Sequence, residues 1–210
     1  MKRKIKIFDN NDLRDKIIVS YNNLSHKEIA EKAIRYIDHI CEITNCLHLK
    51  DNELIKNAIK VNKLWQMEKS RMHDVRQEGF KVHKIARESD SDLEKSVLRT
   101  IGHCVASGHM KEHFIVALDY AIKSVNLISG ENITLVNDER MFQINLLNSN
   151  VKTLYEKNIW GEIMEYKIES TAILKTAENI MANYVIKGWK LHTFTTSHEG
   201  KNYVMVFVKE

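Results

Sequence analysis

Three histidines lie close together in the stretch from Ser96 to Val125. His109 and His113 are four residues apart, so on a helix their rings share one face. A pair with this spacing can bind zinc, and one or two further ligands would complete a site. The metal-binding alternative, either a hydrolase or a sensor, therefore has this ligand set: His103, His109, His113 and Asp119.

The residues around these histidines do not complete a metalloprotease motif. In that motif a glutamate follows the first histidine and acts as the general base, whereas Met110 follows His109 here. Gly108 separates His103 from His109, which leaves the relative direction of their rings open. The second interpretation is that the histidines are half-buried and hydrogen-bonded between helices.

Cys104 follows His103 directly and raises the question of a nucleophile beside its base. Neighbouring residues on a helix point about 100° apart, so these two side chains cannot meet. A buried free thiol is the usual alternative. The sequence has no phosphate-binding loop, dinucleotide fingerprint, nucleophile elbow or cysteine-based zinc motif. We therefore predict that the protein is not an enzyme and needs no cofactor.

Size and composition indicate a globular protein with a substantial core. The chain has 210 residues, of which 43% are apolar and 29% are charged. It contains no apolar run of about 18 residues and no apolar segment behind its charged N-terminus, so neither a membrane span nor a secretion signal is expected. Three cysteines without Cys-x-x-Cys spacing favour a reducing, cytoplasmic location.

The net charge is +4, but basic and acidic residues are interspersed along the chain. Nucleic-acid binding proteins usually carry a clustered basic stripe interleaved with aromatic residues. We therefore expect no nucleic-acid partner.

The first three quarters of the chain is predicted to be helical. Proline is absent, so nothing forces a break inside a helix. Ser25 and Glu28 form a capping-box pattern, and apolar residues behind them recur at helical spacing, which predicts a helix over 25–43. Further helices are expected after a cap at Asp51, over 75–86, from Leu93 into the region of Gly102 and Gly108, over 114–125 and over 138–155. Residues 1–157 should thus form an all-helical bundle.

The pattern changes after residue 158. A strand over 163–168, a helix over 173–185, and strands over 189–195 and 203–208 are predicted, with a turn at 197–202. The fold class is therefore α+β, with residues 158–210 forming a small βαββ domain with an antiparallel sheet. The last strand is apolar at successive positions, so we expect its second face to be covered by the helical domain or by another copy. An oligomeric scaffold is thus a further alternative.

Two motifs frame the histidine stretch. Leu98 to His113 reads LRTIGHCVASGHMKEH and is followed by Asp-Tyr-Ala-Ile-Lys at 119–123. Upstream lies His-Lys-Ile-Ala-Arg at 83–87, and downstream lies Glu-Arg-Met-Phe-Gln at 139–143.

These motifs resemble a helical family of bacterial immunity proteins from polymorphic toxin systems. The family carries an AGHAVATAH-x-x-x-H run that ends in YA-x-KA, with a shorter H-x-x-A-R segment before it and an E-R-x-x-Q helix after it. The resemblance covers about residues 10–157, although larger residues replace some family alanines at Ile101, Val105 and Ile115. It is carried by His83, Arg87, Gly102, His103, His109, His113, Tyr120 and Lys123.

The resemblance implies a function in binding. A protein of this family would neutralise a cognate protein toxin by covering its surface, and the family assigns no catalytic residue. Residues 164–209 are also similar to a short uncharacterised bacterial domain with an EYK start, a G-W-E-L turn and a final F-K-R, although Lys190 replaces its glutamate. That likeness implies a βαββ fold and self-association into a homo-oligomer.

Overall fold

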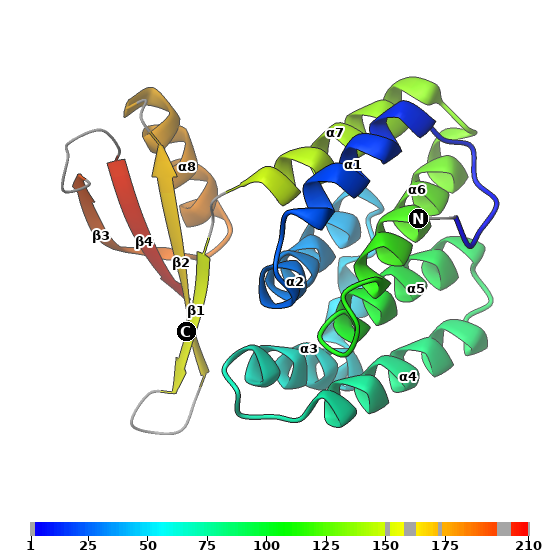
Figure 1. Ribbon diagram of the computed structural model, residues 1–210, viewed down its shortest axis with the longest axis horizontal. Helices are drawn as coiled ribbons and strands as arrows, with labels where there is room; N and C mark the ends of the chain where they lie inside the picture. The colour runs from blue at the N-terminus through cyan, green and yellow to red at the C-terminus, as the bar shows by residue number, and fades with distance from the viewer. Residues whose placement is uncertain (1–2, 150–151, 158–162, 172–173, 197–202, 210) are drawn as a thin grey trace. The chain divides into compact units, whose positions relative to one another are not determined.

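The computed structural model describes residues 3–149, 152–157, 163–171, 174–196 and 203–209. The chain divides into two compact units, Met1–Asn148 and Ser149–Glu210 (Figure 1). The first is helical, and the second holds an antiparallel sheet with one helix. The boundary lies before the one predicted at residue 157, because the last helix of the first unit ends at Asn148.

The helices of the first unit follow one another through short connections. In chain order they are α1 (Asn11–Asn22), α2 (His26–Ile43), the short 3-10 helix η1 (Leu47–Asp51), α3 (Glu53–Gln66), α4 (Met72–Glu88), α5 (Asp92–Ala106), α6 (His113–Ser129) and α7 (Ile133–Asn148). The sequence pattern did not predict α1. Among the described residues, no helix is long and apolar enough to cross a membrane.

Helix starts follow the capping rules. Ser25 accepts a hydrogen bond from the backbone N–H of Glu28, whose carboxylate accepts one from the Ser25 backbone, so the predicted capping box opens α2. The predicted cap at Asp51 is wrong. Asp51 closes η1, and the Asn52 side chain instead accepts from the backbone N–H of Leu54, at 2.9 Å.

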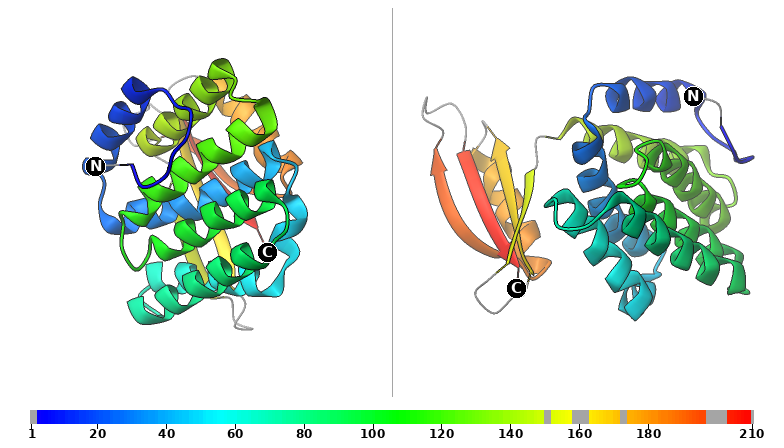
Figure 2. Two further views of the ribbon diagram at one scale, coloured as in Figure 1. Left: turned by 90° about the vertical axis from the view of Figure 1, so that its right-hand side faces the viewer. Right: turned by 60° about the horizontal axis from the view of Figure 1, so that its bottom comes forward.

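The helices pack as a curved row around α2. Helix α5 lies between α4 and α6, α7 lies between α6 and α1, and α3 packs beside α4 (Figures 1 and 2). Helix α2 contacts α3, α5, α6 and α7, and its inward face is fully buried. That face carries Ile29, Ala33, Tyr36, Ile37, Ile40 and Cys41. This packing holds α4, α5 and α6 side by side, where the motif residues lie.

The second unit is a four-stranded antiparallel sheet with strand order β1-β2-β4-β3. Its elements are β1 (Lys152–Lys157), β2 (Ile163–Thr171), α8 (Leu174–Ile186), β3 (Lys190–Thr196) and β4 (Tyr203–Lys209). The predicted β-α-β-β order corresponds to β2, α8, β3 and β4. Strand β1 was not predicted. Its residues pair with the backbone of β2, whereas the sequence predicted that a helix would continue to Tyr155. The predicted turn at 197–202 lies outside the described residues.

Helix α8 covers one face of this sheet. Trp189, Met205 and Phe207 are buried and pack against partly buried side chains of α8. The rings of Tyr184 and Phe207 stack with their centroids 4.3 Å apart. This small core is built from α8, from Trp189 in the connection that follows it, and from β4.

Candidate functional site

Three helices bring three motif histidines together. His83 lies on α4, His103 on α5, and His113 is the first residue of α6. The ring centroids of His83 and His103 are 4.5 Å apart, and those of His103 and His113 are 5.2 Å apart. The three rings, which we call the histidine cluster, are partly buried. Helix packing alone assembles it, because α5 lies between α4 and α6.

Within the cluster two rings are hydrogen-bonded to each other. Nδ1 of His103 lies 3.0 Å from Nδ1 of His113. One nitrogen must therefore carry a proton and donate it, while the other accepts. The pair can take up one further proton at an Nε2 atom and keep this bond, but a second proton would leave two donors facing each other.

A glycine makes room for the third ring. If Gly102 carried a Cβ atom, that atom would lie 2.6 Å from both Cε1 and Nδ1 of His83. Real side chains do not approach so closely. The glycine directly before His103 therefore lets the His83 ring lie against the backbone of α5. This close packing explains why the motif has glycine at position 102.

Burial and neighbouring cations keep these rings neutral near pH 7. Burial, followed by the charges of Arg99, His113 and Arg87, lowers the pKa of His83 to about 4. Burial, the other two rings, Arg99 and Lys4 lower the pKa of His103 to about 2.

The pKa of His113 is also lowered, first by burial and then by His109 and Lys4, while Glu112 opposes the shift. The cluster is therefore neutral under physiological conditions.

Other motif residues lie around this centre. The Tyr120 ring stacks with His103 at a centroid distance of 5.5 Å. His109 lies in the α5–α6 connection, and its ring centroid is 6.0 Å from that of His113. Arg87 is exposed on α4, one turn after His83, and Lys123 is exposed on α6. Most motif residues therefore gather where α4, α5 and α6 meet, and Lys123 is exposed further along α6.

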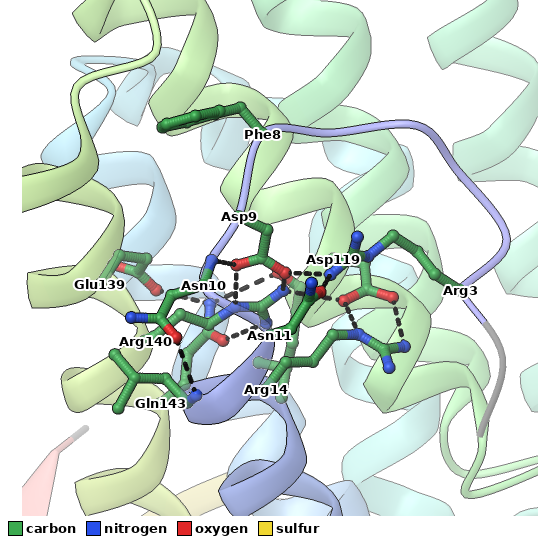
Figure 3. Close-up of polar contacts among 12 residues, drawn as sticks. Arg3, Phe8, Asp9, Asn10, Asn11, Arg14, Asp119, Glu139, Arg140 and Gln143 are labelled. Carbon is green, nitrogen blue, oxygen red and sulfur yellow. Dashed lines mark hydrogen bonds and ion pairs between the residues drawn. The ribbon is translucent and has the colours of Figure 1, made fainter.

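The predicted metal-ligand set is not assembled. Asp119 accepts two hydrogen bonds from Arg14 and one from Arg140, each at 2.9 Å, so its carboxylate is committed to arginines (Figure 3). Within the described ranges, no group of three or more His, Cys, Asp or Glu side chains is arranged to hold a metal ion. Helical spacing alone does not show which face Asp119 takes in three dimensions.

Asp119 belongs instead to a buried ionic network. Arg140 is fully buried and donates to Asp9 as well as to Asp119, and Arg3 also pairs with Asp9 (Figure 3). The network connects the N-terminal segment, α1, α6 and α7. Its acidic and basic members neutralise each other, as buried charges require.

A second branch of this network uses the rest of the Glu-Arg-x-x-Gln motif. Glu139 accepts from the hydroxyl of Tyr36 and from the side-chain amide Nε2 of Gln143 at 2.9 Å. Its carboxylate is also hydrogen-bonded to Nε2 of His39 at 2.7 Å. Gln143 in turn accepts from Arg140 at 2.8 Å. This motif therefore locks α7 onto α2. The sequence alone indicated no structural role for this Glu-Arg-x-x-Gln motif.

Cys104 is inert in this setting. Its side chain is fully buried, and burial raises the pKa of its thiol well above the ordinary value. A thiol that stays protonated is a poor nucleophile. The expectation that Cys104 and His103 do not form a catalytic pair is consistent with this position.

Together, the fold and the site define an all-helical unit whose motif residues serve packing and a neutral imidazole cluster. The chain belongs to the Imm-5 like putative immunity protein family, whose model matches residues 20–150. Comparison with curated proteins and with solved structures finds no match. The family match confirms the predicted immunity-family resemblance for the helical part, and the likeness suggested for the C-terminal unit stays a prediction.

Proposed function

We propose that this protein is a bacterial immunity protein that binds and neutralises a cognate protein toxin. The observation that carries the proposal is the family match over residues 20–150, which runs from the last residues of α1 through α7. In this proposal the protein works in the cytoplasm, by covering the surface of its toxin and without catalysing a reaction.

The burial of the motif residues supports a binding role. The charged side chains of Arg14, Asp119 and Arg140 are buried, and each is paired with an opposite charge. These charges are therefore occupied in holding the fold together. What reaches the surface near the motif is a set of arginines and partly exposed rings, including Arg87, Arg99 and Tyr120. Arginine and aromatic residues are enriched among the anchors of protein interfaces.

Co-expression tests the proposal directly. Each candidate toxin gene that neighbours the gene of this protein is expressed in a bacterial host, with and without the full chain. We expect one toxin to arrest growth alone and to be tolerated with the chain, and that toxin to co-purify with it. The control is the chain with Ile37→Asp, which places a charge in the fully buried face of α2 and should abolish protection. Failure of every neighbouring product to be neutralised or bound would contradict the proposal.

A second function, self-association through the sheet, is favoured by β4. Met205 and Phe207 are fully buried against α8, so Val206 between them belongs to the opposite face of the strand. Val206 is partly exposed, and the sequence has valines at 204 and 208 as well. Light scattering of the full chain and of Val206→Lys tests this. A dimer that becomes a monomer supports self-association, and a monomer in both cases contradicts it.

A further inference from the structure

The histidine cluster is surrounded by cations that come from three parts of the chain. Arg87 lies on α4, Arg99 on α5, and Lys4 in the segment before α1. Arg87 follows His83 by one turn of α4, and Arg99 precedes His103 by one turn of α5, so each arginine shares a helix face with a ring of the cluster. The charges of Arg99 and Lys4 also help to lower the pKa of His103. Positive charge therefore converges on the rings from two helices and the N-terminal segment.

These three cations are unpaired, unlike the arginines deeper in the helical unit. Arg3, Arg14 and Arg140 each form an ion pair with an aspartate. Among the residues that the structure describes, no hydrogen bond or ion pair joins Arg87, Arg99 or Lys4 to any partner. Glu112, beside His113, is a carboxylate that partly offsets this positive charge. The surroundings of the cluster thus carry excess positive charge.

The cluster itself offers unused hydrogen-bonding capacity. The His103–His113 bond uses one nitrogen of each ring and leaves both Nε2 atoms, one of which carries a proton. Nδ1 of His83 also has no hydrogen-bond partner, but it is buried beside Gly102, so the two Nε2 atoms are the ones left for a ligand. Guanidinium and imidazole N–H groups are donors, and donors grouped with positive charge suit an oxygen anion.

A metal ion would not suit this place. Its positive charge would be repelled by Arg87, Arg99 and Lys4, and the described residues offer no three-ligand set for it. An anion, by contrast, would neutralise these cations and accept from the rings.

We infer that His83, His103 and His113, with Arg87, Arg99 and Lys4 around them, form a binding site for an oxyanion, namely a carboxylate or a phosphate group. This inference does not depend on toxin neutralisation, because the isolated protein suffices to test it. A bound anion favours the protonated form of the rings, so the site should take up a proton as it fills. The groups that set this uptake are the three cations, His109, Glu112 and Tyr120, which face the cluster from α4, α5, α6 and their connections.

The test is a histidine-ring NMR titration of the full chain at pH 6.5. Potassium phosphate and sodium acetate are added in separate series, with chloride adjusted to keep the ionic strength constant. We expect the ring signals of the cluster to move along a saturable curve, while those of exposed His73 do not. Tighter binding of phosphate would identify a phosphate-bearing ligand, and acetate binding of equal or greater strength would identify a carboxylate.

Charge-matched variants make the test decisive. Arg99→Gln and Arg87→Gln should each weaken binding by about tenfold, as expected for the loss of one charge-assisted hydrogen bond. Lys60→Gln removes the same charge from the exposed face of α3 and should change binding by less than about twofold, since a distant exposed charge is screened by salt. Circular dichroism verifies that each variant is folded. If Arg99→Gln does not fold, the Arg87→Gln variant alone tests the site, because Arg87 is exposed.

The absence of saturation with both anions would overturn the inference. So would equal binding by Arg87→Gln and Lys60→Gln.

Discussion

Nδ1 of His103 lies 3.0 Å from Nδ1 of His113, so a single proton between two neutral imidazoles connects α5 to α6. The bond forms at the point where the chain reverses between these helices, and His83 from α4 packs against the His103 ring. A motif that suggests metal binding in one dimension is therefore a three-helix contact in three dimensions. Its dependence on protonation leads to the first prediction.

The protein should lose stability in mild acid. The pKa of His83 is lowered to about 4 and that of His103 to about 2, whereas an unfolded histidine titrates near 6.5. Below about pH 6.5 the unfolded chain therefore binds more protons, so this stability is present above that pH and is lost as the pH falls toward 4. The loss should be about 2 kcal/mol for each of these two rings between pH 7 and 5. Urea unfolding at several pH values measures it.

Two variants separate the cluster from other titrating groups. His103→Asn keeps an amide that can bond His113 but cannot titrate, so its stability should fall less between pH 7 and 5. His73→Gln alters an exposed histidine on α4 and should keep the full pH dependence. If both variants lose stability with pH as steeply as the natural protein, the cluster is not the source of the effect.

Gly102→Ala should destabilise the protein although it raises helix propensity. Alanine inside a helix is favoured over glycine by about 1 kcal/mol. Here its Cβ would lie 2.6 Å from the His83 ring, and overpacking of this kind costs about 1–3 kcal/mol. Chemical unfolding of Gly102→Ala, His83→Ala and the double variant measures the coupling. Because the smaller side chain removes the clash, the double variant should be more stable than the two separate losses predict, and simple additivity would count against this contact.

Arg140→Met should be among the most damaging substitutions in the helical unit. Arg140 is fully buried and bonds both Asp9 and Asp119, so its loss leaves buried carboxylates with fewer partners. Removing one member of a buried ion pair costs about 3–5 kcal/mol. Arg71→Met removes an arginine from an exposed pair with Asp74 and should change stability little. Thermal unfolding compares the two, and similar effects would show that the network contributes no more than a surface pair.

Gly130→Ala should cost about 1 kcal/mol, because the residue ends α6 in the left-handed conformation with φ of 62°. No atom lies within 4 Å of an added Cβ, so the cost is conformational and not steric. Asparagine tolerates this conformation better, so Gly130→Asn should cost less. Urea unfolding ranks the two variants, and an alanine variant as stable as the natural protein would contradict the explanation.

Local patterns in the sequence predicted much of the helical unit. The capping box at Ser25 and the helical spacing behind it determine α2, and both depend on residues within a few turns of one another. The family motif was likewise readable from a short stretch. Helix α1 was missed, and β1 was taken for helix, because β1 forms only through backbone pairing with β2.

The sequence by itself determined the order of the helices, the family, and the residues that mark the motif, since these depend on neighbours along the chain. Only the tertiary structure decided what the motif residues do. Asp9 and Arg140 are 131 residues apart in sequence, so no local sequence pattern predicts that they form an ion pair. Asp119 joins the arginines and not the histidines because helix packing turns it toward α1 and α7. The same packing places His83 against Gly102 and surrounds the rings with unpaired cations, which converts a suggested metal site into a neutral cluster in a positive environment.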